Sequence, residues 1–260
     1  MTRADKRNLI IIIALIVCIV IAGFLLGDCM PQVGSEDTPA NSYLSTYYIE
    51  NSLPDTETPN IVTAILADYR GFDTLFETCV MFLSGVTALA ILFNGKKKEI
   101  KKTPEKVEKD YDDPSFGGTI LETSFRLVVP IVIIYAFYVL AHGELSLGGG
   151  FQAGALLASV YLTDRLIPSS HKPIVRFSGE TAAATAGVGV FIYALTGILP
   201  MFNGGNLFEY EKLPFACAVH DVVQLHSVGI FMIEVGVTIA VMATIIAILE
   251  AVMERTEFDG

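Results

Sequence analysis

Charged residues are scarce in this 260-residue sequence, and familiar catalytic motifs are missing from it. Only 17% of the residues are charged whereas 52% are hydrophobic, a balance typical of integral membrane proteins rather than soluble ones. The net charge is −11, which argues against nucleic acid as a partner because phosphate binding requires a basic face. There is no P-loop, no G-x-S-x-G and no H-E-x-x-H motif, so no catalytic residue is predicted.

Cysteine is also rare, and the four residues, Cys18, Cys29, Cys79 and Cys217, are scattered. They form no C-x-x-C pair and no His/Cys cluster, so we predict no iron–sulfur, haem or zinc site and expect no cofactor in this chain. Cys29 and Cys217 can both lie outside the membrane and form a disulfide, but whether they do is left open by the sequence.

Apolar runs predict an all-α integral membrane protein with about six transmembrane helices. About 20 residues cross the ~30 Å apolar layer of a bilayer at ~1.5 Å per residue. The runs cover residues 9–27, 59–93, 116–141, 148–162, 180–199 and 222–249. The first run is long for a signal peptide, so we expect it to be retained.

The distribution of basic residues predicts the orientation. Lys and Arg gather in residues 1–8, 94–113 and 164–176, whereas the loops at residues 28–58 and 200–219 are acidic. By the positive-inside rule, both termini are cytoplasmic, and we expect a multi-pass protein of the plasma membrane.

A lysine-rich connector divides the chain. Residues 94–115 contain seven lysines, which are typical of a cytoplasmic loop, although lipid headgroups attract such clusters too. We therefore predict an N-terminal two-helix region at residues 1–93, a cytoplasmic linker at residues 94–115 and a four-helix region at residues 116–260.

A glycine-rich turn at residues 142–154 interrupts two apolar runs. Its sequence is H-G-E-L-S-L-G-G-G-F-Q-A-G, with Gly148, Gly149, Gly150 and Gly154 where a helix is expected to begin. Glycine supplies backbone freedom at positive φ and lets a neighbouring helix approach closely. The turn also carries His142, an ionisable side chain close to the hydrocarbon, and such groups suggest function.

The last apolar run contains two further ionisable residues, His226 and Glu234. They are eight residues apart, slightly over two helical turns, and so lie on similar faces. A carboxylate at this depth must be neutral, paired, or beside water or an ion, and burial favours its protonated form. We predict a role in ion translocation for Glu234, His226 and His142. The alternative is that neighbouring helices satisfy these groups and their role is structural.

Arg70, Asp73 and Glu77 form a second group of candidates. Asp73 is three residues and Glu77 seven residues after Arg70, so the three share one helical face. Two interpretations remain open: a solvated helix end whose charges pair with one another, or a charged face that enters the membrane beside a partner protein.

Two motifs in the second half resemble a known family. The turn at residues 142–154, together with H-S-V-G-I at residues 226–230 and I-E-V-G-V at residues 233–237, is similar to the MnhB-type subunit of Mrp multisubunit sodium/proton antiporters. Archaeal membrane-bound hydrogenases and sulfur-reducing complexes contain this type of protein too. Leu147 stands where the family usually has proline.

The first half resembles another protein of the same module. The sequence N-I-V-T-A-I-L-A-D-Y-R-G-F-D-T-L-F-E at residues 60–77 is similar to the small subunit that precedes MnhB, with Phe76 where that family favours glycine. The chain therefore resembles a fusion of two neighbouring subunits, joined through the lysine-rich connector.

These resemblances imply a function and partners. They imply a membrane subunit of a sodium/proton antiporter module, with sodium ions and protons as the transported species. The implied partners are the other antiporter-module membrane subunits, including complex I-like antiporter subunits, within the lipid bilayer. The alternative is a purely structural subunit that bridges larger antiporter subunits in a hydrogenase, a sulfur-reducing complex or another respiratory complex. In both cases no redox centre is expected in this chain, although the parent complex can be a cation-translocating oxidoreductase.

Overall fold

The structure is a computed structural model that describes residues 3–29, 38, 43–93, 118–166, 177–214 and 224–259. The lysine-rich linker at residues 94–115 lies outside the described residues. Cys217 does as well, so the Cys29–Cys217 disulfide stays a prediction.

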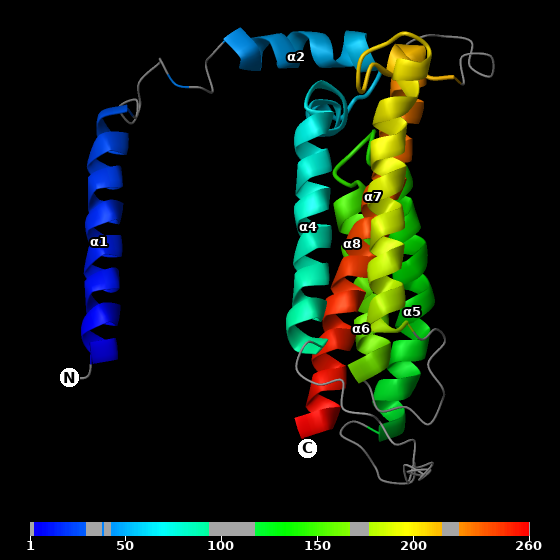
Figure 1. The fold of residues 1–260 in the computed structure, drawn as a ribbon. Helices are drawn as coiled ribbons and strands as arrows, with labels where there is room; N and C mark the ends of the chain where they lie inside the picture. Colours follow the sequence, from blue (N-terminus) through cyan, green and yellow to red (C-terminus); the bar gives the residue numbers. More distant parts are fainter. Residues whose placement is uncertain are drawn as a thin grey trace. The chain divides into compact units, whose positions relative to one another are not determined.

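Helices make up almost all of the described chain (Figure 1), and no strand occurs in the ranges given above. The prediction of an all-α membrane protein is therefore confirmed. In chain order the elements are α1 (Arg3–Cys29), α2 (Tyr43–Thr56), α3 (Ile61–Thr63), the π-helix η2 (Ala64–Tyr69), α4 (Gly71–Phe93), α5 (Gly118–Ala141), α6 (Gly150–Leu166), α7 (Gly179–Phe202), the 3-10 helix η3 (Tyr210–Lys212) and α8 (Gln224–Asp259).

The chain forms two compact units, Met1–Ile49 and Glu50–Gly260. The first contains α1, whose described side chains at residues 12–25 are exposed on every face of the helix. A helix that is apolar all round and unburied by protein is suited to a lipid environment.

Four helices of the second unit are long and apolar enough to cross a membrane: Gly71–Leu92, Glu122–Ala141, Gly179–Phe202 and Gln224–Met253. Among the other described helices, α6 has 17 residues and the apolar part of α1 is Ile12–Leu25. The count of six crossings and the cytoplasmic position of both termini stay predictions.

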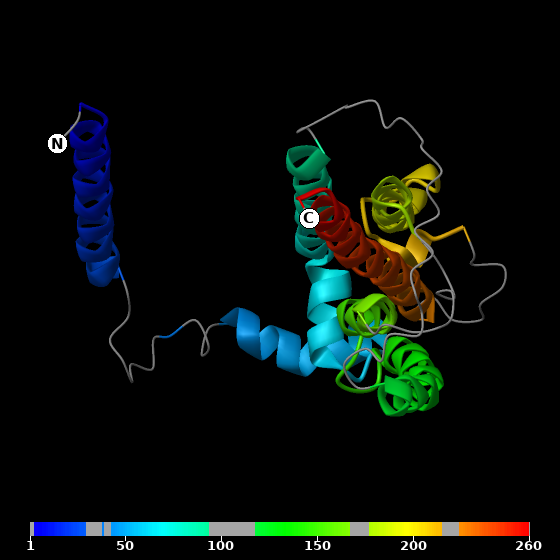
Figure 2. The same ribbon diagram turned by 90° about the horizontal axis from the view of Figure 1, so that it is seen from below.

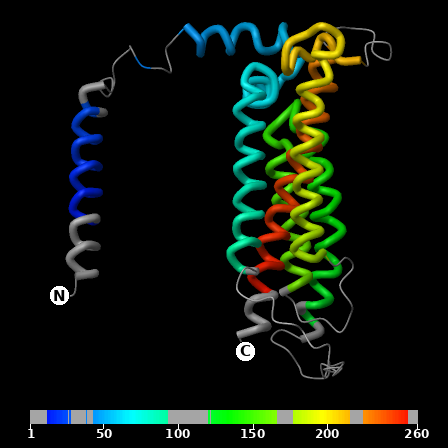
Figure 3. Tube along the Cα trace, viewed as in Figure 1, coloured from blue at the N-terminus to red at the C-terminus, as the bar shows by residue number. Residues whose placement is uncertain are grey.

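Helix α8 is the centre of the second unit. It packs against α4, α6 and α7, and the views along and across the helices show it between α4 and α7 with α6 beside it (Figures 2 and 3). Its buried face is continuous from Leu225 to Ala251. This explains why α8 is apolar nearly all round, since several helices cover it at once.

Small residues allow α7 and α8 to approach closely. A Cβ atom built on Gly189 would lie 2.5 Å from the Ala240 backbone nitrogen and 2.6 Å from the Gly236 carbonyl oxygen. The abundance of Ala and Gly in α7 therefore permits backbone-to-backbone packing in membranes.

We predict that Gly189→Ala destabilises the second unit, by roughly 1–3 kcal/mol, because the new methyl group overlaps the backbone of α8. Gly187→Ala is the matched control in the same helix, since its Cβ would meet only the Phe82 ring, at 3.5 Å. Thermal unfolding of the two purified variants in detergent measures the difference. Equal midpoints would contradict the close packing of α7 on α8.

Candidate functional site

The turn between α5 and α6 is built from glycine at the positions where backbones meet. Gly149 has a φ of 122°, a conformation that side-chain-bearing residues rarely adopt. Cβ atoms on Gly148, Gly150 and Gly154 would lie 2.7 Å, 2.4 Å and 2.8 Å from backbone carbonyl oxygens. For Gly150 that oxygen belongs to Glu234, so the start of α6 lies directly against α8.

The Glu234 side chain is buried against this turn. Its residue is 7% exposed, and Cβ atoms on Gly143 and Gly149 would lie 2.7 Å and 3.1 Å from its carboxyl oxygens. Its Oε2 atom has no hydrogen-bond partner among the described residues. The glycines therefore make room for a carboxyl group that the neighbouring side chains leave unsatisfied.

A second buried glutamate on α8, Glu250, is fully satisfied by comparison. Arg165 Nε donates to Glu250 Oε1 at 2.8 Å, and the Tyr161 hydroxyl donates to the same oxygen at 2.7 Å. Such pairing is what a buried carboxylate normally requires. Glu234 and Glu250 are similarly buried, yet within the described part of the chain only Glu250 has a cationic partner.

Glu234 lines a cavity of about 220 Å³. The cavity is enclosed by residues of α3, η2, α4, α6, α7 and α8. Its polar side chains are Asn60, Thr63, Thr74, Gln152, Tyr193 and Glu234. A polar cavity of this size has room for water molecules or a small cation beside the carboxyl group.

Two residues near the start of α3 hold the turn in place. The Asn60 Nδ2 group donates to the carbonyl oxygens of Gly143 and Ser146, at 2.9 and 2.7 Å, and Thr63 Oγ1 donates to Gly143 at 2.8 Å. The backbone nitrogen of Asn60 donates to the Glu144 carbonyl at 2.9 Å. These contacts satisfy buried backbone groups that the irregular turn cannot pair internally.

His226 lies on the first turn of α8 and is paired with Asp68 of η2. The His226 Nδ1 atom is within hydrogen-bonding distance of Asp68 Oδ2. Its Nε2 atom lies 3.8 Å from Glu211 Oε1 and has no hydrogen-bond partner among the described residues. His226 and Glu234, predicted to lie on similar faces of one helix, thus have separate surroundings.

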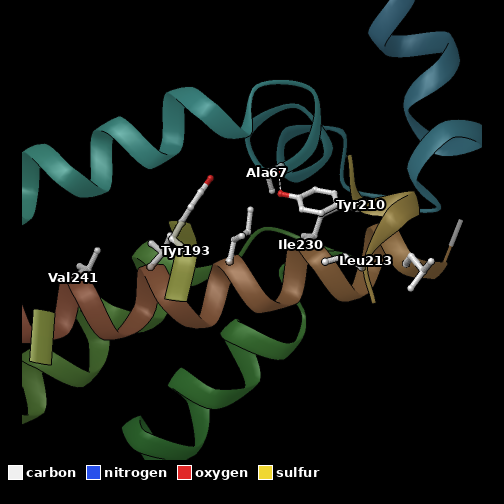
Figure 4. Packing of buried hydrophobic residues seen from close by; sticks show 9 residues of the cluster. Ala67, Tyr193, Tyr210, Leu213, Ile230 and Val241 are labelled. Carbon is white, nitrogen blue, oxygen red and sulfur yellow. Dashed lines mark hydrogen bonds between the residues drawn. The ribbon is translucent and has the colours of Figure 1, made fainter. Parts of the chain in front are cut away.

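The π-helical turn η2 is held by side chains from elsewhere. The Tyr210 hydroxyl donates to the Ala67 carbonyl at 2.8 Å (Figure 4), and Thr74 Oγ1 donates to the Leu66 carbonyl at 2.8 Å. Tyr210 is fully buried and its ring packs edge-on to His226, with ring centroids 6.0 Å apart. The wider turn therefore places Asp68 against α8, and π-turns are often found at functional sites.

The remaining candidates lie at the edge of this arrangement. Arg70 Nε donates to Asp73 Oδ2 at 2.6 Å, and the two side chains are 58% and 48% exposed. Glu77, one turn further along α4, is exposed. Self-pairing of this kind is what the solvated-helix-end interpretation of Arg70 and Asp73 predicts. His142 is half-buried, and its ring stacks on Tyr138 with centroids 4.3 Å apart.

Sequence reasoning missed Asn60, Thr63 and Asp68 as members of the site. Asp68 was visible only as one of several charges in its segment, and Asn60 only as a residue at the start of a helix. Each contacts residues at least 80 positions away.

Comparison with known families identifies both halves. Residues 120–247 match the family described as "Domain related to MnhB subunit of Na+/H+ antiporter". Residues 7–106 match the MbhE family, which is a subunit of MBH. The chain joins an MbhE-related domain to an MnhB-related domain. The predicted resemblance to MnhB, fused to the protein that precedes it, is therefore confirmed.

Curated relatives of the chain include antiporter subunits. A probable K+/H+ antiporter protein of Rhizobium meliloti, itself an A/B fusion, is 24% identical over 78% of this chain and 22% of its own length. A Na+/H+ antiporter subunit of Bacillus subtilis is 27% identical over 48% of this chain and 91% of its own length. An uncharacterized protein of Methanocaldococcus jannaschii is 31% identical over 60% of this chain and 62% of its own length. The chain thus spans less than two thirds of two of these relatives.

Two solved structures share the fold. The Mrp complex from Dietzia matches with a TM-score of 0.65 and 24% identity over 96% of this chain and 26% of that chain. The membrane-bound sulfane sulfur reductase, an archaeal respiratory membrane complex, matches with a TM-score of 0.62 and 24% identity over 92% of this chain and 97% of that chain.

The polar contacts at the site cross from one matched region to the other. Asn60, Thr63 and Asp68 lie within the MbhE match, whereas the glycine turn and His226 lie within the MnhB-related match. Side chains from the MbhE-related domain therefore hold the turn against which the MnhB-related domain buries Glu234.

We predict that Asn60→Asp destabilises the second unit by about 1–3 kcal/mol, since a carboxylate would replace the amide that donates to two carbonyl groups. The substitution keeps Oδ1, which caps Val62. The matched control is Asn203→Asp, which loses one exposed hydrogen bond to the Lys212 carbonyl. Differential scanning calorimetry of the purified protein measures both. If Asn60→Asp unfolds no earlier than the control, Asn60 does not hold the turn.

Proposed function

We propose that this chain is a multi-pass plasma-membrane subunit of an Mrp-type cation/proton antiporter module, and that Glu234 takes part directly in ion translocation. The observation that carries the proposal is the buried Glu234 carboxyl group, whose Oε2 atom has no partner among the described residues, beside a polar cavity. The relatives' names support alkali cations and protons as the transported species.

The physical argument begins with the cost of burying a carboxylate. An ionised carboxyl group without a partner in an apolar environment costs several kcal/mol. Glu234 therefore holds a proton or has a cation or water beside it in the cavity. A group that changes between these two states is what exchange of a cation for a proton requires. The proposal needs no redox centre in this chain.

The partners follow from the exposed apolar faces. Large hydrophobic side chains on α4 and α5 are exposed in the isolated chain, including Phe72, Phe76, Leu127 and Ile134. Membrane helices with such faces contact lipid or neighbouring helices. The solved structures that share the fold are complexes, so we propose that other antiporter-module membrane subunits, including complex I-like antiporter subunits, pack here.

A structural bridging role is the second candidate. The observation that favours it is the set of hydrogen bonds from Asn60 and Thr63 to the turn, together with the close glycine packing of α6 and α7 on α8. In this case the chain joins larger antiporter subunits of a hydrogenase, a sulfur-reducing complex or another respiratory complex, and transports nothing itself.

The test is Glu234→Gln in membrane vesicles that contain the assembled complex. We expect cation-dependent proton exchange to fall by roughly a hundredfold, the scale on which a positioned acid–base group contributes. The amide keeps the shape of the side chain but cannot bind and release a proton. Exchange is followed with a pH-sensitive fluorescent dye after a pulse of NaCl or KCl.

The matched control is Glu180→Gln, the same chemical change at an exposed position at the start of α7. It is expected to leave exchange unchanged. Co-purification of the neighbouring subunits with each variant separates loss of assembly from loss of transport. Normal exchange by an assembled Glu234→Gln complex would sink the transport role and leave the bridging role.

A further inference from the structure

A second carboxyl group, Glu144, lies close to Glu234 in the same glycine turn. We infer that Glu144, with Ser227, is the entry through which protons from the outer side reach Glu234. This inference rests on the proposed transport role of Glu234, and on the predicted orientation that places the turn on the outer side. Glu144 would be a proton-relay residue of the same site.

The first observation is a contact between the turn and α8. Ser227 Oγ donates a hydrogen bond to Glu144 Oε2, and both residues are half-buried. The Glu144 carbonyl oxygen is fixed as well, since it accepts from the Asn60 nitrogen at 2.9 Å. The carboxyl group is therefore held at one place on α8, partly in contact with solvent.

The second observation is the direction of the Glu234 side chain. Ser227 precedes Glu234 by seven residues, close to two helical turns, so the two lie on one face of α8, about 10 Å apart along the axis. Helical side chains lean toward the N-terminus of their helix. Consistently, Glu234 reaches Gly143, the residue immediately before Glu144. The two carboxyl groups thus approach each other across one short piece of backbone.

The third observation is electrostatic. Burial raises the pKa of the Glu144 carboxyl above its ordinary value, and the hydrogen bond from Ser227 acts in the opposite direction. The negative charge of Glu144 also disfavours a second negative charge on Glu234. The pair therefore tends to hold a proton, and holding it at one site disfavours holding it at the other.

The proton balance of the step is simple. A proton from the outer solution binds the Glu144 carboxylate. It then passes, directly or through confined water, to the ionised Glu234, so that Glu144 becomes ionised and Glu234 neutral. No oxidant, reductant or other co-reactant is needed. Other titratable groups around this end of α8 are His226, Asp68 and Glu211.

The experiment varies the external pH of right-side-out vesicles that contain the assembled complex, at fixed internal pH. We expect Glu144→Gln to lower exchange at least about tenfold and to abolish the part of the external-pH dependence that Glu144 causes. Glu144→Asp is expected to retain it. Glu209→Gln, which changes a carboxyl group paired with Lys212 in the predicted outer loop, is the matched control and is expected to match the wild type.

Ser227→Ala gives a readout that a purely structural role would not move. The hydrogen bond from Ser227 lowers the pKa of Glu144, so its loss raises that pKa. The midpoint of the external-pH profile should therefore shift to higher pH, with exchange retained. This variant keeps both carboxyl groups, so it decides the matter even if Glu144→Gln fails to assemble.

The outcomes separate the two proposals. If Glu234→Gln is inactive while Glu144→Gln and Ser227→Ala behave as the wild type, protons reach Glu234 by another route and only the entry is wrong. If Glu234→Gln is also fully active, the transport role fails and the entry fails with it. Loss of exchange in Glu144→Gln together with an upward shift in Ser227→Ala supports both.

Discussion

The burial of one carboxyl group against backbone determines how this protein is put together. Glu234 occupies space that exists only because Gly143, Gly149 and Gly150 have no side chains. Those glycines bring the start of α6 against α8, and the same contact closes one side of the cavity. A larger residue at any of these positions would have to move either the carboxyl group or a helix, so packing and chemistry depend on one feature.

The two matched domains share this constraint. The turn belongs to the MnhB-related domain, but its outward-facing carbonyl groups are satisfied by Asn60 and Thr63 of the MbhE-related domain. The pairing of Asp68 with His226 and the bond from Tyr210 to Ala67 cross the same boundary. A turn with so many unpaired backbone groups would be costly in an apolar environment. The front half therefore completes the site, in addition to contributing a helix long and apolar enough to cross a membrane.

Sequence reasoning reached the local features of this arrangement and missed the long-range ones. Apolar runs, glycine spacing and a charge within a membrane helix are local, and they located α8, the turn and Glu234. The partners of these residues depend on how helices far apart in the chain come together. Asp68 is 158 residues from His226, and Asn60 is 83 residues from Gly143. The π-helical form of η2 was also beyond a pattern based on 3.6 residues per turn, because side chains from α4 and η3 stabilise it.

The comparison of Glu234 with Glu250 bears on why an unpaired carboxyl group is present at all. Both are on α8 and both are buried, at 7% and 3% exposure. At Glu250 the fold supplies Arg165 and Tyr161, so this architecture can satisfy a buried carboxylate. At Glu234 it supplies glycine and a polar cavity instead. A fixed cation would hold the group ionised permanently, whereas a cavity lets a proton, water or a mobile cation come and go. The difference is the one expected between a glutamate that holds helices together and a glutamate that exchanges ions.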